Sequence, residues 1–347
     1  MRRIFLQICS IYPQAFFRYD GPMIKAEITD KELLDQLDSI EKDGMTVFVM
    51  ADGLFRGALY NGTCMVNQMR QNHHLGILET LVLGQAELCA ALLIQTMKGR
   101  EHLTFRYDTK GPAAGFSVEA DSSGYVRGHL FQNPIPVEKP LESWDLAPFF
   151  GEGTLSISRM GEGMKQAQTG TVEIRHKNIA KDLAWYFAQS EQVHTAFNTS
   201  IQFDKQGRVI GAGALFLQAV PGAGGKSKAS AQTADSGNED MEAKTAELIA
   251  RAENAFRACP SLGTWFAEKG KREDIIHGLF REFAPTSVLE RDIIFDCPCS
   301  AETFAGHIKH LPKAELEDII AHDPDPLEVV CHCCGSKYKI YKKMLKD

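Results

Sequence analysis

Five of the nine cysteines lie after residue 296, and their spacing is that of a metal-binding site. Cys297 and Cys299 form a Cys-x-Cys pair, and Cys331, Cys333 and Cys334 follow as a second cluster. Four thiolates with such spacing suit Zn²⁺ in a closed tetrahedral site, which is structural and leaves no coordination position for a substrate. The sequence therefore predicts one zinc ion per chain, held by the first pair and by two thiols of the second cluster.

A glycine indicates which two thiols of the second cluster bind the metal. In a thiolate knuckle the second cysteine is commonly followed by glycine, because glycine reaches positive φ without a side-chain clash and lets backbone amides turn toward the sulfurs. Gly335 directly follows Cys334, so we expect Cys331 and Cys334 to complete the ligand set. Cys333 is an alternative to Cys334, although no glycine follows it. Four nearby histidines are weaker alternatives: His307, His310, His322 and His332.

The same spacing also allows redox chemistry. A Cys-x-Cys or Cys-x-x-Cys pair is close enough in sequence to form a disulfide within the pair, although the shorter pair would be strained. Oxidation of both pairs would remove all four ligands, so the metal would leave and the small unit around it would lose its staple. The residues alone permit such a switch without showing one. A zinc site that only holds a domain together is the alternative.

Hydrophobic periodicity predicts one folded unit over 23–221, ahead of the cysteines and after an extension of unknown role over 1–22. Residues 45–61 alternate as strands do, and 76–98 is nearly apolar all round, as a buried helix is. Further strands are expected over 103–108, 153–160, 170–176 and 199–220, and a further helix over 179–192.

A change in composition divides the rest of the chain. Residues 222–240 contain nothing more apolar than alanine, which predicts a flexible polar linker. Residues 241–296 predict two helices and a strand with a modest core, so their stability should depend on their neighbours. Residues 297–347 form a small unit with two short amphipathic segments between the cysteine pairs. The expected fold class is α+β: a mixed α/β core domain, a metastable helical linker region and a small zinc-binding domain.

Charge and hydropathy argue against several classes of protein. The net charge of −7 does not suit a protein that grips nucleic acid, because such proteins usually present a basic face to phosphates. No stretch approaches the roughly 20 uninterrupted apolar residues of a membrane span. The odd, unevenly placed cysteines do not suggest a secreted disulfide scaffold, and no catalytic constellation indicates an enzyme. We expect a cytoplasmic protein without nucleic-acid or membrane partners.

Several motifs together resemble the heat-shock protein 33 family, the redox-regulated holdase chaperones. The Cys-x-Cys-Ser of 297–300 and the Cys-x-x-Cys-Gly of 331–335, with Tyr338, are similar to the C-terminal signature of that family. In the first unit, residues 110–134 resemble a Gly-Pro and Val-Arg-Gly stretch of the family, and residues 179–196 resemble its helix with a Ser-Glu-Gln turn. The cysteine pattern is the most specific part of the resemblance.

The resemblance covers residues 45–220 and 288–341 and includes departures. His194 stands where the family usually has proline, Gln85 stands where arginine is usual, and Cys333 is extra. The polar linker and the N-terminal extension are also longer than is typical. None of these departures removes a predicted zinc ligand, but Cys333 leaves the disulfide pairing open.

The resemblance implies a mechanism without catalytic turnover. In the reduced state Cys297, Cys299, Cys331 and Cys334 would bind zinc, and the chaperone would be inactive. Oxidation would pair Cys297 with Cys299 and Cys331 with Cys334, release zinc and unfold the region 241–296. Apolar surface would then bind unfolding client proteins without ATP, and the oxidised form would be a homodimer. The candidate client-binding surface is the apolar set of that region: Trp265, Phe266, Ile275, Ile276, Leu279, Phe280 and Phe283.

Two other classes compete with a holdase. A constitutive zinc-ribbon protein would bind nucleic acid or another protein through the basic stretch 337–346, although a solvated C-terminal face explains that stretch as well. A thiol–disulfide oxidoreductase would need an exposed Cys-x-x-Cys with a low pKa, usually at a helix N-terminus. The sequence predicts no such strand–Cys-x-x-Cys–helix arrangement, so the oxidoreductase ranks last.

Overall fold

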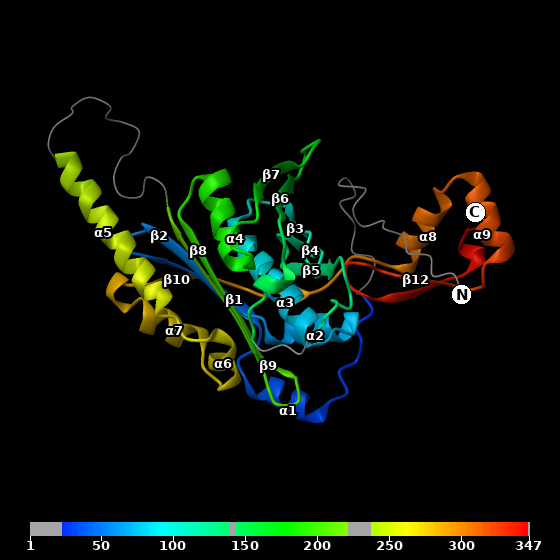
Figure 1. Cartoon of the computed structure of the whole chain (residues 1–347), viewed down its shortest axis with the longest axis horizontal. Helices are drawn as coiled ribbons and strands as arrows, with labels where there is room; N and C mark the ends of the chain where they lie inside the picture. Colours follow the sequence, from blue (N-terminus) through cyan, green and yellow to red (C-terminus); the bar gives the residue numbers. More distant parts are fainter. Residues whose placement is uncertain (1–22, 139–142, 221–236, 346–347) are drawn as a thin grey trace.

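The computed structural model describes residues 23–138, 143–220 and 237–345. The predicted extension 1–22 and most of the predicted linker 222–240 lie outside the described residues. Two large sheets and the helices packed on them confirm the expected α+β class. The small C-terminal unit lies at one end of the molecule and the helix α5 at the other (Figure 1).

A five-stranded antiparallel sheet forms one layer of the core, in the order β10-β1-β2-β9-β8. The alternation in 45–61 becomes the hairpin of β1 and β2, and a second hairpin joins β8 to β9. The edge strand β10 comes from the region 241–296, far along the chain from its partner β1. The strands are β1 (Gly44–Met50), β2 (Phe55–Asn61), β8 (Thr195–Phe203), β9 (Val209–Ala219) and β10 (Thr286–Arg291).

A six-stranded sheet forms the second layer, in the order β11-β5-β4-β3-β6-β7. Its edge strand β11 also comes from the region 241–296 and pairs in parallel with β5. Both large sheets therefore end in a strand from the region that the sequence predicts to be metastable. The strands are β3 (Glu101–Thr109), β4 (Gly115–Asp121), β5 (Tyr125–Leu130), β6 (Gly153–Gly161), β7 (Gln168–Glu173) and β11 (Ile294–Phe295).

Two helices, α2 (Thr63–His73) and α3 (Ile77–Leu93), fill the core between the sheets. α3 contacts strands of both sheets and is buried along almost its whole length, which confirms the buried helix expected from its composition. The window Ile77–Thr96 is long and apolar enough to cross a membrane, but 89% of it is buried inside the fold. It is therefore the core helix of this domain. A further helix, α4 (Ile179–Tyr186), packs against β8.

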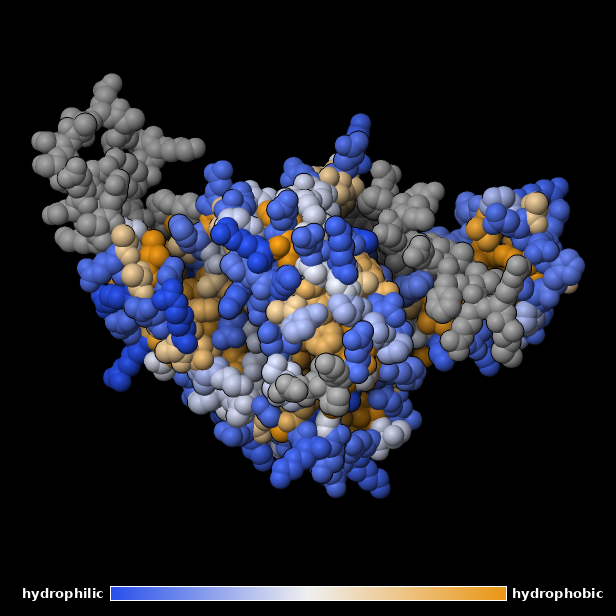
Figure 2. All heavy atoms as spheres, viewed as in Figure 1, coloured by the Kyte–Doolittle hydropathy of each residue, from blue (hydrophilic) through white to orange (hydrophobic). Residues whose placement is uncertain are grey.

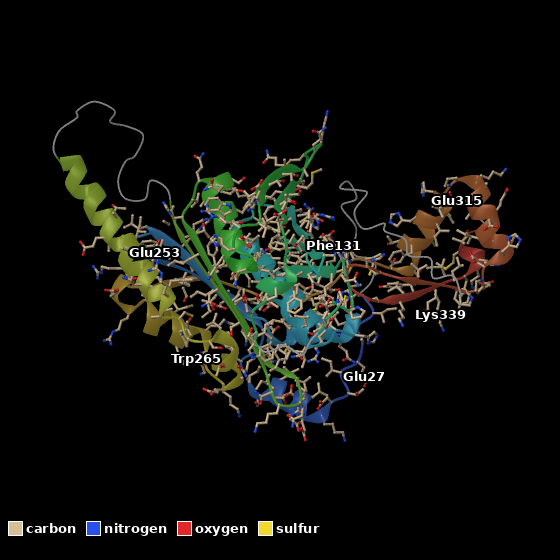
Figure 3. All side chains as sticks on the ribbon, in the orientation of Figure 1. Glu27, Phe131, Glu253, Trp265, Glu315 and Lys339 are labelled. Carbon is tan, nitrogen blue, oxygen red and sulfur yellow. The ribbon has the colours of Figure 1, made fainter. Side chains whose placement is uncertain are left out.

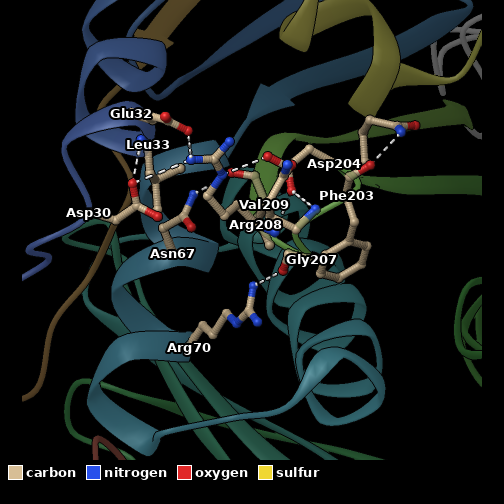
Figure 4. A network of polar contacts seen from close by, with 12 residues as sticks. Asp30, Glu32, Leu33, Asn67, Arg70, Phe203, Asp204, Gly207, Arg208 and Val209 are labelled. Atoms are coloured by element: carbon tan, nitrogen blue, oxygen red, sulfur yellow. Dashed lines mark hydrogen bonds and ion pairs between the residues drawn. The ribbon is translucent and has the colours of Figure 1, made fainter.

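A polar network ties the first helix, α1 (Lys31–Ser39), to the turn between β8 and β9 (Figure 4). Arg208 lies at its centre. Its Nη1 donates to Glu32 Oε2 at 2.6 Å and to Asp30 Oδ1 at 3.4 Å, and its Nε donates to Asp204 Oδ2 at 2.6 Å. The network fixes the start of the described chain to the five-stranded sheet.

The region 241–296 covers the face of the five-stranded sheet opposite α2 and α3. Its helices are α5 (Gly237–Arg257), α6 (Leu262–Ala267) and α7 (Arg272–Leu279). They lie along the sheet in Figure 1, with hydrophobic residues visible between their hydrophilic outer faces and the sheet in Figure 2.

The prediction of two helices and one strand for this region is wrong in number, because the structure has three helices and the strands β10 and β11. α6 begins only a few residues after α5 ends, and this second helix start was not predicted. Ser261 starts α6 by accepting a hydrogen bond from the backbone N–H of Thr264. A two-residue strand such as β11 leaves too short a pattern to read.

The C-terminal unit contains two helices and a two-stranded sheet. The two short amphipathic segments expected between the cysteine pairs are the helices α8 (Ala301–Lys309) and α9 (Lys313–His322), and β12 (Leu327–Val330) pairs with β13 (Lys337–Ile340). The apolar faces of the two helices pack into one core, and Figure 2 shows hydrophobic residues gathered between them. This small core frames the cysteine cluster.

Candidate metal and redox centre

The four predicted ligands come from two loops that close on each other. Cys297 and Cys299 follow β11, whereas Cys331 and Cys334 lie in the turn between β12 and β13. The four Sγ atoms lie within 4.8 Å of one another, and all four side chains are buried. Cys297 Sγ lies 3.9 Å from Cys331 Sγ, and Cys299 Sγ lies 3.4 Å from Cys334 Sγ. Sulfurs placed about 2.3 Å from a tetrahedral zinc would be about 3.8 Å apart, so this donor set fits one such ion.

The glycine after the last ligand adopts the conformation expected of it. Gly335 has φ 70°, in the left-handed region that glycine enters without strain. Its backbone N–H donates to the carbonyl of Cys331 at 2.8 Å, and the N–H of Cys331 donates to the carbonyl of Ser336 at 2.9 Å. These bonds close the knuckle and orient the sulfurs of Cys331 and Cys334 toward the first pair.

The alternative ligands lie outside the cluster. Cys333 is buried but does not belong to the group of sulfurs that could share a metal, and none of the histidines belongs to any such group among the described residues. The ring of His332 lies 5.7 Å from that of His129, while His310 and His322 make polar contacts within their own helices. The geometry therefore favours four thiolates.

Two hydroxyl groups contact the sulfurs, and neither contact was predicted from the sequence. Tyr338 Oη lies 3.1 Å from Cys299 Sγ and donates to the carbonyl of Cys299 at 2.9 Å. Ser336 Oγ lies 3.2 Å from Cys334 Sγ. The alternation of β13 places Tyr338 on its buried side, which is a usable sequence signal, but Ser336 lies in a turn and gives none.

The cluster is electrostatically coupled. Hydrogen bonds from neighbouring thiols, that of Cys299 foremost, hold the pKa of Cys297 well below its ordinary value. The interaction with Cys297 raises the pKa of Cys299 and of Cys331, and burial adds to both increases. Protein groups alone therefore favour a thiolate at Cys297 and disfavour one at Cys299 and Cys331. A divalent cation would supply the positive charge that four thiolates need.

The cysteine knuckle also contacts the first domain. A Cβ on Gly335 would lie 2.4 Å from the carbonyl oxygen of Asn72, at the C-terminal end of α2. Ser336 Oγ donates to the carbonyl of Ile24 at 2.8 Å. Next to this contact, burial lowers the pKa of His73 to about 4, which keeps its imidazole neutral near pH 7. The centre is thus built against the core domain as well as within its own unit.

The apolar set of the region 241–296 lies in a second core, away from the cysteines. Five of its members are buried and two are partly buried, with Trp265 on α6 labelled in Figure 3. The rings of Phe280 and Phe48 are 5.5 Å apart, and those of Phe283 and Phe55 are 6.4 Å apart. The opposing sheet face contributes the other half of this core: Phe48, Met50, Phe55, Leu59, Leu215 and Leu217.

The seven residues are therefore not exposed in this state. Trp265 and Leu279 are the partly buried members, and the buried members are Phe266, Ile275, Ile276, Phe280 and Phe283. Their partners on the sheet were not predicted, because strand residues buried on both faces of a sheet do not indicate which helix covers them.

The fold thus combines two large sheets with a helical region that supplies an edge strand to each of them. A small unit follows, and its four buried cysteines could hold a metal ion. A family model described as Hsp33 protein matches residues 43–341. The chain belongs to the Hsp33 family.

Similar proteins agree with this assignment. The 33 kDa chaperonin of Lactococcus lactis subsp. cremoris (strain MG1363) is 26% identical, over 86% of this chain and 96% of that protein. The 33 kDa chaperonin of Lactobacillus delbrueckii subsp. bulgaricus is 29% identical, over 82% and 90%. A crystal structure of the 33 kDa chaperonin of Thermotoga maritima, a heat shock protein 33 homologue, matches with a TM-score of 0.74 at 26% identity, over 88% and 97%.

The resemblance read from the cysteine pattern is thereby confirmed, and the protein is a chaperone of this family with a cysteine cluster that suggests redox regulation. A chaperone of this kind binds client proteins.

Proposed function

We propose that this chain is a redox-regulated, ATP-independent holdase whose reduced, zinc-bound form is inactive. The observation that carries the proposal is the place of the cysteine cluster. The cluster begins directly after β11, the last strand of a region whose apolar helices cover one face of the core sheet. A change at the cysteines therefore acts on the chain segment that keeps this face covered.

In the reduced state Cys297, Cys299, Cys331 and Cys334 would hold one zinc ion per chain. When bound, zinc neutralises the thiolates and cross-links the two loops that carry them. Ser336 and Tyr338 orient two of the sulfurs, and Gly335 keeps the knuckle against α2. The region 241–296 then stays folded on the five-stranded sheet, and little apolar surface is exposed for a client to bind.

Peroxide supplies the oxidising equivalents. In each pair one sulfur attacks the peroxide and forms a sulfenic acid with loss of water, and the second sulfur displaces the hydroxyl group as a second water. One peroxide is reduced to two waters for each disulfide, Cys297–Cys299 and Cys331–Cys334. Both disulfides together leave no thiolate for the metal, so the small unit loses its cross-link.

Unfolding of the C-terminal unit would release the region 241–296 from the face of the five-stranded sheet. The apolar residues of this region share one core with the face of the five-stranded sheet, so the burial of its helices depends on their contact with that face. Each large apolar side chain that leaves such a core costs roughly 1.5–3 kcal/mol, and an unfolding client can replace that lost burial. The uncovered sheet face and the released apolar set would hold the client, and two oxidised copies would associate as a homodimer.

The proposal includes the remaining predictions from the sequence. Clients are unfolding proteins, neither nucleic acid nor a membrane is a partner, the location is cytoplasmic, and no catalytic turnover occurs.

Disulfide mapping tests the proposal. Reduced, zinc-loaded protein is treated with peroxide at mild heat, alkylated and digested without reductant, and client aggregation is followed in the same samples. We expect peptides with the links 297–299 and 331–334 to accumulate as aggregation is suppressed. Links between the two pairs, or suppression that precedes any disulfide, would contradict the proposed switch. Protein that keeps all thiols reduced and binds no client would instead be a constitutive zinc-ribbon protein.

A further inference from the structure

The edge strand β10 is held to the sheet by its backbone more than by its side chains. It pairs antiparallel with β1 from Met45↔Arg291 to Val49↔Thr286, with a bulge between Val47 and Phe48. Its first five residues are exposed, and Val288 and Leu289 are 54% and 49% exposed although both are apolar. A strand with such exposed side chains is held in the sheet mainly by its main-chain hydrogen bonds.

Most side-chain contacts of β10 are with other residues of the region 241–296. Glu290 pairs with Arg272 Nη2 at 3.2 Å, and Ser287 Oγ lies 3.3 Å from Glu273 Oε1, so both partners belong to α7. Arg291 alone reaches the core domain, where its Nη2 donates to the carbonyl of Ser122 at 2.6 Å. If α7 leaves the sheet, β10 loses most of what fixes it apart from the ladder itself.

The partner strand β1 is held independently of β10. It pairs along its whole length with β2, and its residues are buried almost throughout. Loss of β10 would leave one edge of β1 with unpaired backbone N–H and C=O groups, and such an edge is a template for another strand. That edge borders the sheet face with Phe48 and Met50, which would be uncovered in the same event.

We propose that an extended segment of an unfolding client takes the place of β10 on β1 by β-strand addition. The inference rests on the proposed function, because it requires the release of the region 241–296. The occupant is an extended polypeptide, since the structure already shows an antiparallel strand seated there. The first five residues of β10 are exposed, so the edge should accept a strand of almost any sequence, with main-chain hydrogen bonds as the source of affinity. Such an edge would serve clients that share no sequence.

A synthetic peptide of residues 284–293, which carries β10, is the probe. Consecutive residues of a strand direct their N–H groups to opposite edges, so a peptide N-methylated at Leu289 and one N-methylated at Glu290 block different edges. We expect the parent peptide to bind oxidised full-length protein and not the reduced form, and to displace an unfolding client. One methylated peptide should bind at least fivefold more weakly than the parent, the other should match the parent, and a scrambled peptide should bind within about threefold of it.

Strand addition predicts that only one edge of the peptide pairs with β1. Equal binding of both methylated peptides, or an equal loss of binding for both, would therefore overturn it. Failure of the parent peptide to bind oxidised protein that still suppresses client aggregation would also overturn it while leaving the holdase proposal intact. Oxidised protein that suppresses no aggregation would instead refute the proposed function itself.

Discussion

At the scale of single residues, the turn at Gly335 carries the most information about the metal centre. The residue order Cys-x-x-Cys-Gly was enough to predict both the positive φ and the choice of Cys334 over Cys333 as the sulfur facing the cluster. The contact of that glycine with Asn72 could not be predicted, because nothing local to either residue encodes a contact between a C-terminal knuckle and the end of α2.

The two neighbouring thiols give a matched pair of variants. Cys334→Ser should lose tightly bound zinc, since a hydroxyl group is a poor substitute for one of four thiolates. Cys333→Ser should keep one zinc per chain, because the Cys333 sulfur lies outside the cluster. Zinc content after gel filtration of the reduced variants checks both. Loss of zinc from Cys333→Ser with retention in Cys334→Ser would show that the assigned ligand is wrong.

Arg272 is the residue that most directly fastens the helical region to the core domain. Its Nε donates to Thr46 Oγ1 at 3.0 Å, its side chain is only 14% exposed, and its Nη2 pairs with Glu41 and Glu290. Because these are charge-assisted bonds in a partly buried site, Arg272→Ala should cost the packed state about 2–3 kcal/mol. We therefore expect the variant to suppress client aggregation at a lower temperature or peroxide dose than the parent protein.

Arg257→Ala is the control for this substitution, because Arg257 pairs with Glu253 on the solvent side of α5 and is 70% exposed. It should leave the onset of activity unchanged, as exposed ion pairs contribute little to stability. An Arg272→Ala protein with the same onset as Arg257→Ala would mean that this contact does not restrain the helical region.

At the scale of elements, local patterns were predictable and long-range pairings were not. Strands β1 and β2, the buried helix α3 and the helices α8 and α9 follow from hydrophobic periodicity within short windows. The pairing of β10 with β1 and of β11 with β5 joins segments far apart in the chain. β10 in particular carries exposed side chains, so no alternation marks it as part of a sheet.

This arrangement predicts where the oxidised protein is cut by proteases. Since both edge strands belong to the region 241–296, its release should expose cleavage sites between 241 and 296 while each sheet keeps its inner strands. Limited proteolysis of reduced and peroxide-treated protein, with fragment masses, tests this. We expect cleavage in that region at least tenfold faster after oxidation, with a resistant fragment that spans β1 to β9. Uniform cleavage across the whole chain would argue for global unfolding instead of a local release.

At the scale of the whole molecule, the cysteine cluster and the apolar core of α5–α7 are separate sites joined by one continuous segment. The cluster lies against α2 and the apolar core lies on the opposite face of the five-stranded sheet. A switch between two states needs an element whose fold both sites influence. In the proposed switch the chain from α5 to β11 would be that element, because it covers the apolar face and ends at the first cysteine pair.

The most direct test of the account follows zinc and client binding in one sample. Reduced protein is mixed with peroxide at mild heat, released zinc is read with a chromogenic chelator, and suppression of client aggregation is scored at the same times. The account predicts that zinc release and suppression rise together and that both reverse when reductant and zinc are restored. Zinc that stays bound while client aggregation is suppressed, or zinc that leaves without any gain in client binding, would contradict the account. The cysteine cluster would then have only a structural role.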